Sequence, residues 1–157
     1  MNLFKKKRDL YAVCNGKSIP QSEIPDEAFA SGMLGQGFGV EPSDGLIRSP
    51  ADGKIQSIAE ARHAYTLLTK DGLDVLVHVG IDTVTLGGKG FLPLVREGDE
   101  VHVGQPIARA DLDLIRAQSL SPTVAVLVTE PDVIDSITFR HGTVAGGKDA
   151  VMSFRLR

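Results

Sequence analysis

The residues of this chain best suited to chemistry are two histidines that lie in or beside apolar segments. His78 lies in the segment 72–84, whose other central residues are aliphatic, and His63 lies one strand-length upstream in the segment 60–65. An imidazole among aliphatic side chains costs free energy unless it has a hydrogen-bond partner, a metal or an opening to solvent. We therefore expect the two histidines to face one shallow site.

A histidine pair of this kind supports two chemistries. A neutral imidazole nitrogen can attack a phosphoryl group and form a labile N–P bond, while the second imidazole stabilises the phosphoryl oxygens. Alternatively, two imidazoles can occupy two of the four positions around Zn²⁺. Both chemistries need the neutral ring and should weaken below a pH of about 6.5, so spacing alone does not choose between them. His102 and His141 lie in polar, turn-like surroundings and are expected to be structural.

The segment around His78 has the alternation of a half-buried strand. Successive side chains of a strand point to opposite faces, so Val75, Val77 and Val79 share one face. Leu76 and His78 share the other. If the valines point into the core, His78 points outward.

Short apolar runs bounded by glycine-containing turns predict the elements that must position the histidines. The runs are 55–58, 65–68, 75–79, 123–128 and 151–156. Their length, valine and isoleucine content and spacing are typical of an all-β sandwich or barrel. The turns at 49–55 and 95–107 resemble those of barrel-sandwich hybrid folds. We expect one or two short helices beside the strands, with 111–118 the best candidate and 131–137 a single turn.

Length and composition favour a soluble protein that does not bind nucleic acid. The chain has 157 residues, 42% hydrophobic residues and a net charge of −3. It therefore lacks the basic character that nucleic acid usually requires. The single cysteine, Cys14, excludes an intrachain disulfide. No apolar run approaches the ~20 residues of a membrane span, and no apolar region follows the basic N-terminal residues. These features predict a cytoplasmic protein.

The N-terminal residues carry an excess of positive charge. Leu3, Phe4, Leu10 and Tyr11 would share one face of a helix, opposite the lysines. We expect residues 1–18 to form a leader that is flexible or weakly amphipathic, and residues 19–157 to form a single domain. Through residues 1–14, such a leader could make a peripheral contact with an anionic membrane.

The segment Gly72-Leu-Asp-Val-Leu-Val-His-Val-Gly-Ile-Asp-Thr-Val84 resembles a known phosphorylation-site signature. It is similar to that of the glucose-type IIA component (type-1 EIIA domain) of the bacterial phosphoenolpyruvate-dependent sugar phosphotransferase system. The resemblance extends from about Ile19 to the C-terminus, and the segments 24–29, 49–53 and 97–98 follow the family's order. It implies a β-sandwich of the barrel-sandwich hybrid type, also called a duplicated hybrid motif.

The resemblance also implies roles for single residues. It makes His78 the residue phosphorylated through Nε2 and His63 the second active-site histidine, with Asp82 the aspartate beside the site. In some family members the two histidines share a zinc ion with a partner's carboxylate. No other cofactor is implied. The implied partner surface consists of Ala28, Phe29, Met33, Leu34, Leu76 and Val84.

The function implied by the resemblance is that of a phosphoryl carrier in sugar uptake. The carrier would accept a phosphoryl group from the histidine phosphocarrier protein HPr. It would pass the group to a cysteine of a sugar-specific IIB domain in a IIB/IIC permease. Some relatives also regulate other enzymes or transporters through their phosphorylation state.

One position departs from the family's pattern. The residue two before the second histidine is commonly threonine, whose hydroxyl can hold that imidazole's tautomer, but here it is Ala61. By strand alternation Ala61 and Tyr65 would share a face with His63. Without the hydroxyl, a backbone carbonyl, a water or another side chain must orient His63.

Two alternatives belong to other functional classes. A zinc-dependent hydrolase of similar β architecture would need a third protein ligand, and no His-x-His or His-x-x-x-Asp grouping includes either histidine. A biotin or lipoate carrier would need a lysine at a hairpin tip. Lys89 lies in a glycine-rich turn but lacks the flanking methionines typical of biotin attachment.

Overall fold

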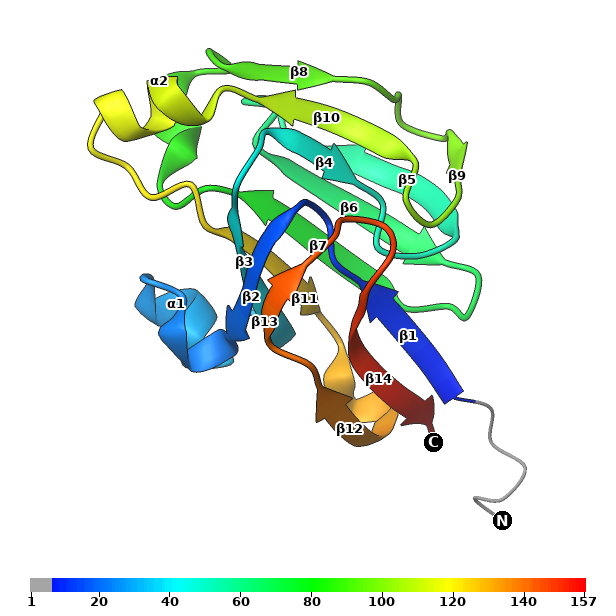
Figure 1. The fold of residues 1–157 in the computed structure, drawn as a ribbon. Helices are drawn as coiled ribbons and strands as arrows, with labels where there is room; N and C mark the ends of the chain where they lie inside the picture. The colour runs from blue at the N-terminus through cyan, green and yellow to red at the C-terminus, as the bar shows by residue number, and fades with distance from the viewer. Residues whose placement is uncertain (1–6) are drawn as a thin grey trace.

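The computed structural model describes residues 7–157, and antiparallel strands make up most of this part of the chain (Figure 1). The strands are β1 (Lys7–Tyr11), β2 (Gly16–Pro20), β3 (Gln36–Pro42), β4 (Leu46–Arg48), β5 (Gly53–Ile58), β6 (Ala64–Thr69), β7 (Asp74–Val79), β8 (Phe91–Pro93), β9 (Glu100–Val101), β10 (Pro106–Ala110), β11 (Val124–Val128), β12 (Ile134–Phe139), β13 (Gly142–Val144) and β14 (Ala150–Leu156). The helices are α1 (Glu27–Ala30) and α2 (Leu112–Ala117), with 3-10 turns η2 (Gln21–Glu23), η3 (Thr83–Leu86) and η4 (Pro131–Val133). The prediction of an all-β sandwich with short helices is confirmed.

The strands form three sheets. The largest has eight strands in the order β13-β2-β3-β11-β7-β6-β5-β9, and the others have the orders β4-β10-β8 and β1-β14-β12. Figure 1 shows β4, β8 and β10 stacked over β5 and β6, with β1, β14 and β12 at the opposite end of the molecule. Both smaller sheets contribute to one continuous apolar core with the large sheet.

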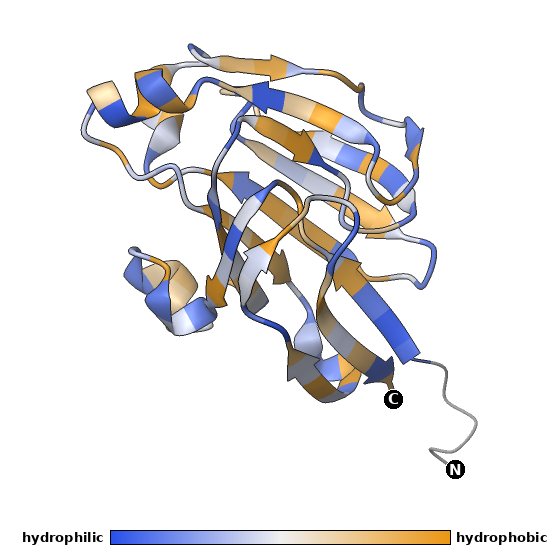
Figure 2. Cartoon of the chain, in the orientation of Figure 1, coloured by the Kyte–Doolittle hydropathy of each residue, from blue (hydrophilic) through white to orange (hydrophobic). Residues whose placement is uncertain are grey.

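Strand β7 separates the main core from the face that carries His78. Val75, Val77 and Val79 are each no more than 1% exposed and belong to the main core. Leu76 and His78 alternate with them on the other face and are half-buried, as predicted. The adjacent β11 is buried along its whole length, which matches its uninterrupted apolar sequence (Figure 2).

A second, smaller apolar cluster covers the His78 face. It consists of Ile19, Ile24, Phe29, Ile81, Ala125 and Leu127, with Leu76 packed against it. Helix α1 brings Phe29 into this cluster. The helix begins where the Asp26 carboxylate accepts a hydrogen bond from the Ala28 amide at 2.9 Å.

The two predicted helical segments had different outcomes. The segment 111–118 forms α2, and its Asp111 side chain accepts a hydrogen bond from the Leu114 amide at 3.1 Å. The segment 131–137 contains only the 3-10 turn η4 before β12 begins, so a single turn is correct only for its first residues. Helix α1 was not predicted because four residues are too few to show a helical period.

The expected leader is wrong for residues 7–18. Strand β1 pairs with β14, and β2 pairs with both β3 and β13. Leu10 and Cys14 are 1% and 0% exposed in the main core, so Leu10 is not available for an amphipathic helix. Burial raises the pKa of the Cys14 thiol to about 12, with a further contribution from Asp44, and this keeps the thiol protonated. Residues 1–6 lie outside the described part of the chain.

None of the helices within residues 7–157 has the length and apolar character needed to cross a membrane.

The burial of β1 gives a stability prediction. Replacing Leu10 by alanine should lower the free energy of unfolding by about 2–5 kcal/mol, because it leaves a cavity in the main core. Urea unfolding followed by circular dichroism measures the change. The exposed Lys7 of the same strand is the control, and Lys7→Ala should change stability by no more than about 0.5 kcal/mol. Equal effects of the two variants would contradict the assignment of β1 to the core.

Candidate functional site

The centre of the candidate site is the imidazole of His78, between β7 and α1. The ring is half-buried, and its centroid lies 4.9 Å from that of Phe29 at an interplanar angle of 57°. Phe29 is only 6% exposed because it also packs in the cluster beneath α1. The helix therefore restricts the His78 ring from one side.

A backbone carbonyl sets the tautomer of His78. The Nδ1 atom lies 2.7 Å from the carbonyl oxygen of Gly80. Since a carbonyl oxygen can only accept, Nδ1 carries the proton and donates it to this bond. In the neutral ring the lone pair is then on Nε2, the nitrogen suited to act as a nucleophile or a metal ligand.

The turn after β7 places the Gly80 carbonyl beside the ring. Gly80 has a φ of +79°, and a Cβ at this position would overlap the side chain of Thr83. The Thr83 hydroxyl donates to the Val79 carbonyl at 2.6 Å. The Gly80 amide donates to the Thr123 carbonyl at 3.0 Å, so both ends of the turn are fixed.

His63 meets His78 by a different route from the one predicted. His63 lies in the turn before β6, where Arg62 has a φ of +63°. The carbonyl of His63 accepts a hydrogen bond from the Val79 amide at 2.7 Å. The two imidazole centroids are 4.9 Å apart at 85°, an edge-to-face contact. The prediction that both histidines face one site is confirmed by this contact.

The predicted strand around His63 is wrong at its start. Strand alternation from Ala61 would have placed His63 with Tyr65, whose ring lies in the main core. Residues 60–63 instead form a turn, and the left-handed backbone of Arg62 interrupts the alternation. His63 is thereby free to pack against His78.

The Nδ1 atom of His63 has no hydrogen-bond partner within residues 7–157, although it is buried. The residue two positions earlier is Ala61, which has no hydroxyl to offer. The hydrogen bond from the Val79 amide fixes the main chain of His63, and the described contact of the ring itself is its edge-to-face packing on His78. The hydroxyl that Ala61 lacks is therefore not replaced at Nδ1 by another hydrogen-bond partner within residues 7–157.

Burial favours the neutral form of both imidazoles. It lowers the pKa of His63, and burial together with the field of His63 lowers the pKa of His78. Three groups oppose the shift at His78 and raise its pKa: the Gly80 carbonyl, Asp26 and Asp82. The depressed pKa of His78 therefore favours the form of the ring that has a free lone pair.

The structure brings two carboxylates close enough to His78 to influence its pKa. Asp82, which the sequence predicted, is exposed at the start of η3 with a φ of +59°. Asp26, which was not predicted, precedes α1 as its N-cap residue. The signal available for Asp26 was its place directly after Pro25 and before Glu27, a common pattern at helix starts.

The predicted partner surface is a mixture of exposed and packed side chains. Met33, Leu34 and Val84 are 79%, 40% and 56% exposed. Three of the predicted residues are partly or wholly covered: Ala28, Phe29 and Leu76. The exposed residues are thus the ones available for contact with another protein, while the covered ones support the site.

The other candidate residues do not join this site. His102 is exposed, 3.8 Å from Asp52, and the His141 ring stacks on Phe139 with centroids 5.5 Å apart. No group of three or more metal-binding side chains occurs within residues 7–157. His63 and His78 alone give two of the ligands that a zinc site needs, so the described residues do not fit a complete metal centre or support the hydrolase alternative.

Comparison with known proteins identifies the class of this chain. A family profile for the phosphoenolpyruvate-dependent sugar phosphotransferase system, EIIA 1, matches residues 8–134. The chain is 40% identical over 144 residues to a glucose-specific EIIA component of Staphylococcus aureus, covering 91% of this chain and 87% of the relative. It is 39% identical over 132 residues to that of Staphylococcus epidermidis, with coverages of 84% and 80%.

A solved structure and a fused relative extend the comparison. Glucose permease IIA from Mycoplasma capricolum superposes with a TM-score of 0.87 and 30% identity, covering 96% of this chain and 97% of that one. A glucose-specific EIICBA component of Streptococcus pneumoniae is 39% identical over 148 residues, which are 94% of this chain but only 20% of that protein. The fold and these matches define a phosphotransferase component. The chain belongs to the EIIA 1 family of the phosphoenolpyruvate-dependent sugar phosphotransferase system.

The contact between the histidines gives a prediction about protonation. His63→Ala should raise the pKa of His78, because it removes a repulsive cation from the protonated pair and opens the ring to solvent. NMR titration of the imidazole resonances measures this change. His102→Ala is the matched control and should leave the pKa of His78 unchanged.

The same shifts set the direction of the pH dependence of stability. Both imidazoles have lowered pKa values in the folded chain, so the unfolded chain binds more protons as the pH falls below about 6.5. The histidine pair should therefore reduce the free energy of unfolding on acidification through that range.

For the NMR titration of the imidazole resonances, a His78 pKa that stayed constant or fell in His63→Ala would contradict the proposed coupling between the two rings.

Proposed function

We propose that this chain is a phosphoryl carrier that accepts a phosphoryl group on Nε2 of His78. The observation that carries the proposal is the bond from Nδ1 to the Gly80 carbonyl, which leaves the lone pair of the neutral ring on Nε2. The half-buried position and the lowered pKa of His78 support a neutral nucleophile at physiological pH.

The donor in this proposal is the histidine phosphocarrier protein HPr. The Nε2 lone pair attacks the phosphorus of the donor's phosphohistidine, whose other ring nitrogen carries a proton. The new N–P bond forms, the donor's N–P bond breaks, and its electron pair stays on the donor nitrogen, so the donor leaves as a neutral imidazole. The positive charge of the donor ring is thereby transferred to the His78 ring. The proton on Nδ1 stays in its bond to Gly80, so His78 needs no proton transfer. In the second step a thiolate of a IIB domain attacks the phosphorus, and the electron pair returns to Nε2.

His63 is proposed to stabilise the transferred group. Its ring lies edge-to-face with His78, so an N–H of His63 can donate to a phosphoryl oxygen. Phosphoryl transfer depends largely on positioning and on such charge stabilisation. The carboxylates of Asp82 and Asp26 repel the phosphoryl group and attract cations, and this favours a positively charged partner surface around the site.

The relatives support finer parts of the proposal. The curated relatives are named as glucose-specific components, and one of them joins EIIA to IIC and IIB in a single chain. We therefore propose glucose as the sugar, a IIB/IIC permease as the acceptor and the cytoplasm as the location. Regulation of other enzymes or transporters would use the same exposed surface in its two phosphorylation states.

The two histidines should differ in a transfer assay. With phosphoenolpyruvate, enzyme I and HPr, the wild-type chain should gain one acid-labile phosphoryl group and His78→Ala none. His63→Ala should still be labelled, but its transfer to a IIB domain should be at least ~100-fold slower because a stabilising donor is lost.

The control for this assay is His141→Ala, which removes an exposed imidazole away from the pair. It should be labelled and should transfer at the wild-type rate. Undiminished labelling of His78→Ala would overturn the proposal, and so would the absence of label on the wild-type chain.

The exposed apolar residues beside the site should control the encounter with HPr. Val84→Asp should raise the apparent KM for HPr about tenfold, because the contact at this position is apolar and desolvating a carboxylate there costs more than its attraction to partner cations returns, while His78 stays intact. Steady-state phosphorylation at varied HPr concentration measures this effect.

Leu92→Asp is the matched control for Val84→Asp. Leu92 is 55% exposed, close to the 56% of Val84, but it lies on β8 in a different sheet. Its substitution should leave the KM for HPr unchanged. Equal effects of the two substitutions would show that the surface around Val84 is not the contact.

A further inference from the structure

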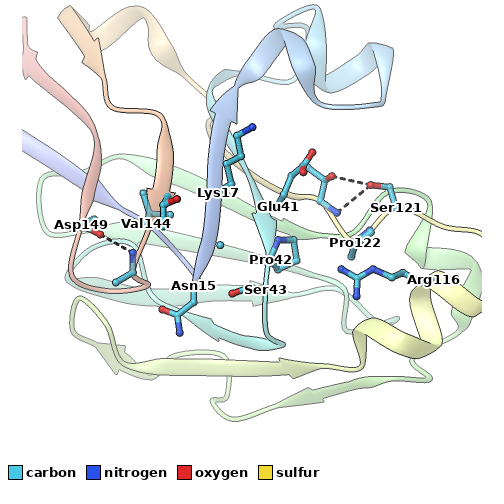
Figure 3. A pocket seen from close by; sticks show the side chains of 14 residues that line it. Asn15, Lys17, Glu41, Pro42, Ser43, Arg116, Ser121, Pro122, Val144 and Asp149 are labelled. Carbon is cyan, nitrogen blue, oxygen red and sulfur yellow. Dashed lines mark hydrogen bonds between the residues drawn. The ribbon is translucent and has the colours of Figure 1, made fainter.

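A large cavity of the described chain lies apart from the histidine pair. It has a volume of about 880 Å³ and lies over β13, β2 and the end of β3 (Figure 3). The segment 121–123, which leads into β11, and Arg116 of α2 complete its wall. Its volume is within the range of ligand-binding clefts, about 300–1,000 Å³.

Three charged side chains that line this cavity have no hydrogen-bond or ion-pair partner among residues 7–157. Lys17 on β2 and Glu41 on β3 are cross-strand neighbours, and Arg116 reaches the cavity from the last turn of α2. None of them makes a hydrogen bond or ion pair within residues 7–157, whereas the Asp149 carboxylate already accepts from the Ala145 amide at 2.7 Å. Two cations and one carboxylate are therefore available to a ligand.

Hydroxyl groups add to this polar lining. Ser43 follows β3, and the hydroxyl of Ser121 lies 2.9 Å from that of Thr123. Lysine and arginine bind phosphate oxygens through charge-assisted hydrogen bonds, and a free carboxylate such as Glu41 accepts from sugar hydroxyls. We propose that the cavity binds a hydroxylated phosphate monoester of monosaccharide size, with the phosphate at Lys17 and Arg116 and the hydroxyls at Glu41.

The wall of the cavity is bonded to the turn that orients His78. The Ser121 carbonyl accepts from the Ile81 amide at 2.8 Å, and the Thr123 carbonyl accepts from the Gly80 amide at 3.0 Å. Gly80 in turn accepts from His78 at 2.7 Å. A ligand that shifts the segment 121–123 changes the position of the Gly80 carbonyl. This alters the hydrogen bond to Nδ1 of His78 and hence the nucleophilicity of Nε2. Given the proposed function, a sugar phosphate formed by the transport reaction acts here as a feedback signal.

Calorimetric titration with glucose 6-phosphate tests the site in the unphosphorylated full chain. Saturable binding with a Kd of about 1 mM or below is expected. The double variant Lys17→Gln/Arg116→Gln should bind at least about tenfold more weakly. The single variant Arg109→Gln, which removes an exposed arginine on β10 outside the cavity, should bind like the wild-type chain.

Three results would overturn the binding site: no saturable binding, unchanged affinity in the double variant, or inorganic phosphate binding as tightly as glucose 6-phosphate. The last result would mean that the cavity recognises only an anion. His78→Ala should retain the wild-type affinity, so failure of the phosphoryl-carrier proposal is distinguishable from failure of this one.

The coupling to His78 has a separate readout. Saturating glucose 6-phosphate should shift the NMR signals of the Gly80 amide and the His78 ring, with the same midpoint as the calorimetric titration. It should also change the rate of phosphorylation by HPr at least about twofold, and the double variant should lose both effects. Binding without a shift at His78 would overturn the coupling.

Discussion

The hydrogen bond from Nδ1 of His78 to the carbonyl of Gly80 is the interaction on which the site depends. It requires a left-handed residue at position 80, and a side chain there would overlap Thr83. Thr83 fixes the end of β7, while carbonyls of the segment 121–123 hold the two amides that follow. Backbone groups that the large sheet holds in place thus set the tautomer of His78, so in the neutral ring the lone pair lies on Nε2 without the help of a side-chain partner.

The two faces of β7 have different roles: one packs in the core, and the other carries the candidate site. The valine face packs in the main core, and the opposite face carries Leu76 and His78 beneath α1. Because β7 lies between β11 and β6, a rigid backbone supports the ring on both sides. The site gains a fixed position from the sheet, while the lower pKa of His78 results from burial and from the neighbouring His63.

The sequence predicted the features that have a period or a specific motif. The alternation of β7, the runs that became β5, β6, β11 and β14, and the meeting of His63 with His78 are all observed. It did not predict the turn at 60–63, because the positive φ of Arg62 has no glycine to mark it. Nor did it predict that residues 7–18 belong to the fold. Strand β1 is stabilised by pairing with β14, over 100 residues away, and such a long-range pairing leaves no local pattern in the sequence. Helix α1 is too short to show a helical period. For the same reason, the position of Asp26 at its start was not predicted.

Helix α1 is held by a small cluster that is separate from the main core. Its four residues contribute Phe29 to a group of six buried side chains, and its end is bonded mainly to itself and to the Gln21 side chain. Segments with so few tertiary contacts open at a lower free energy than the whole domain. We therefore expect the wall around His78 to open at a lower free energy than the large sheet. For the carrier proposed above, which meets a donor and then an acceptor, this separation lets the surface beside the site adapt while the imidazole keeps its bond to Gly80.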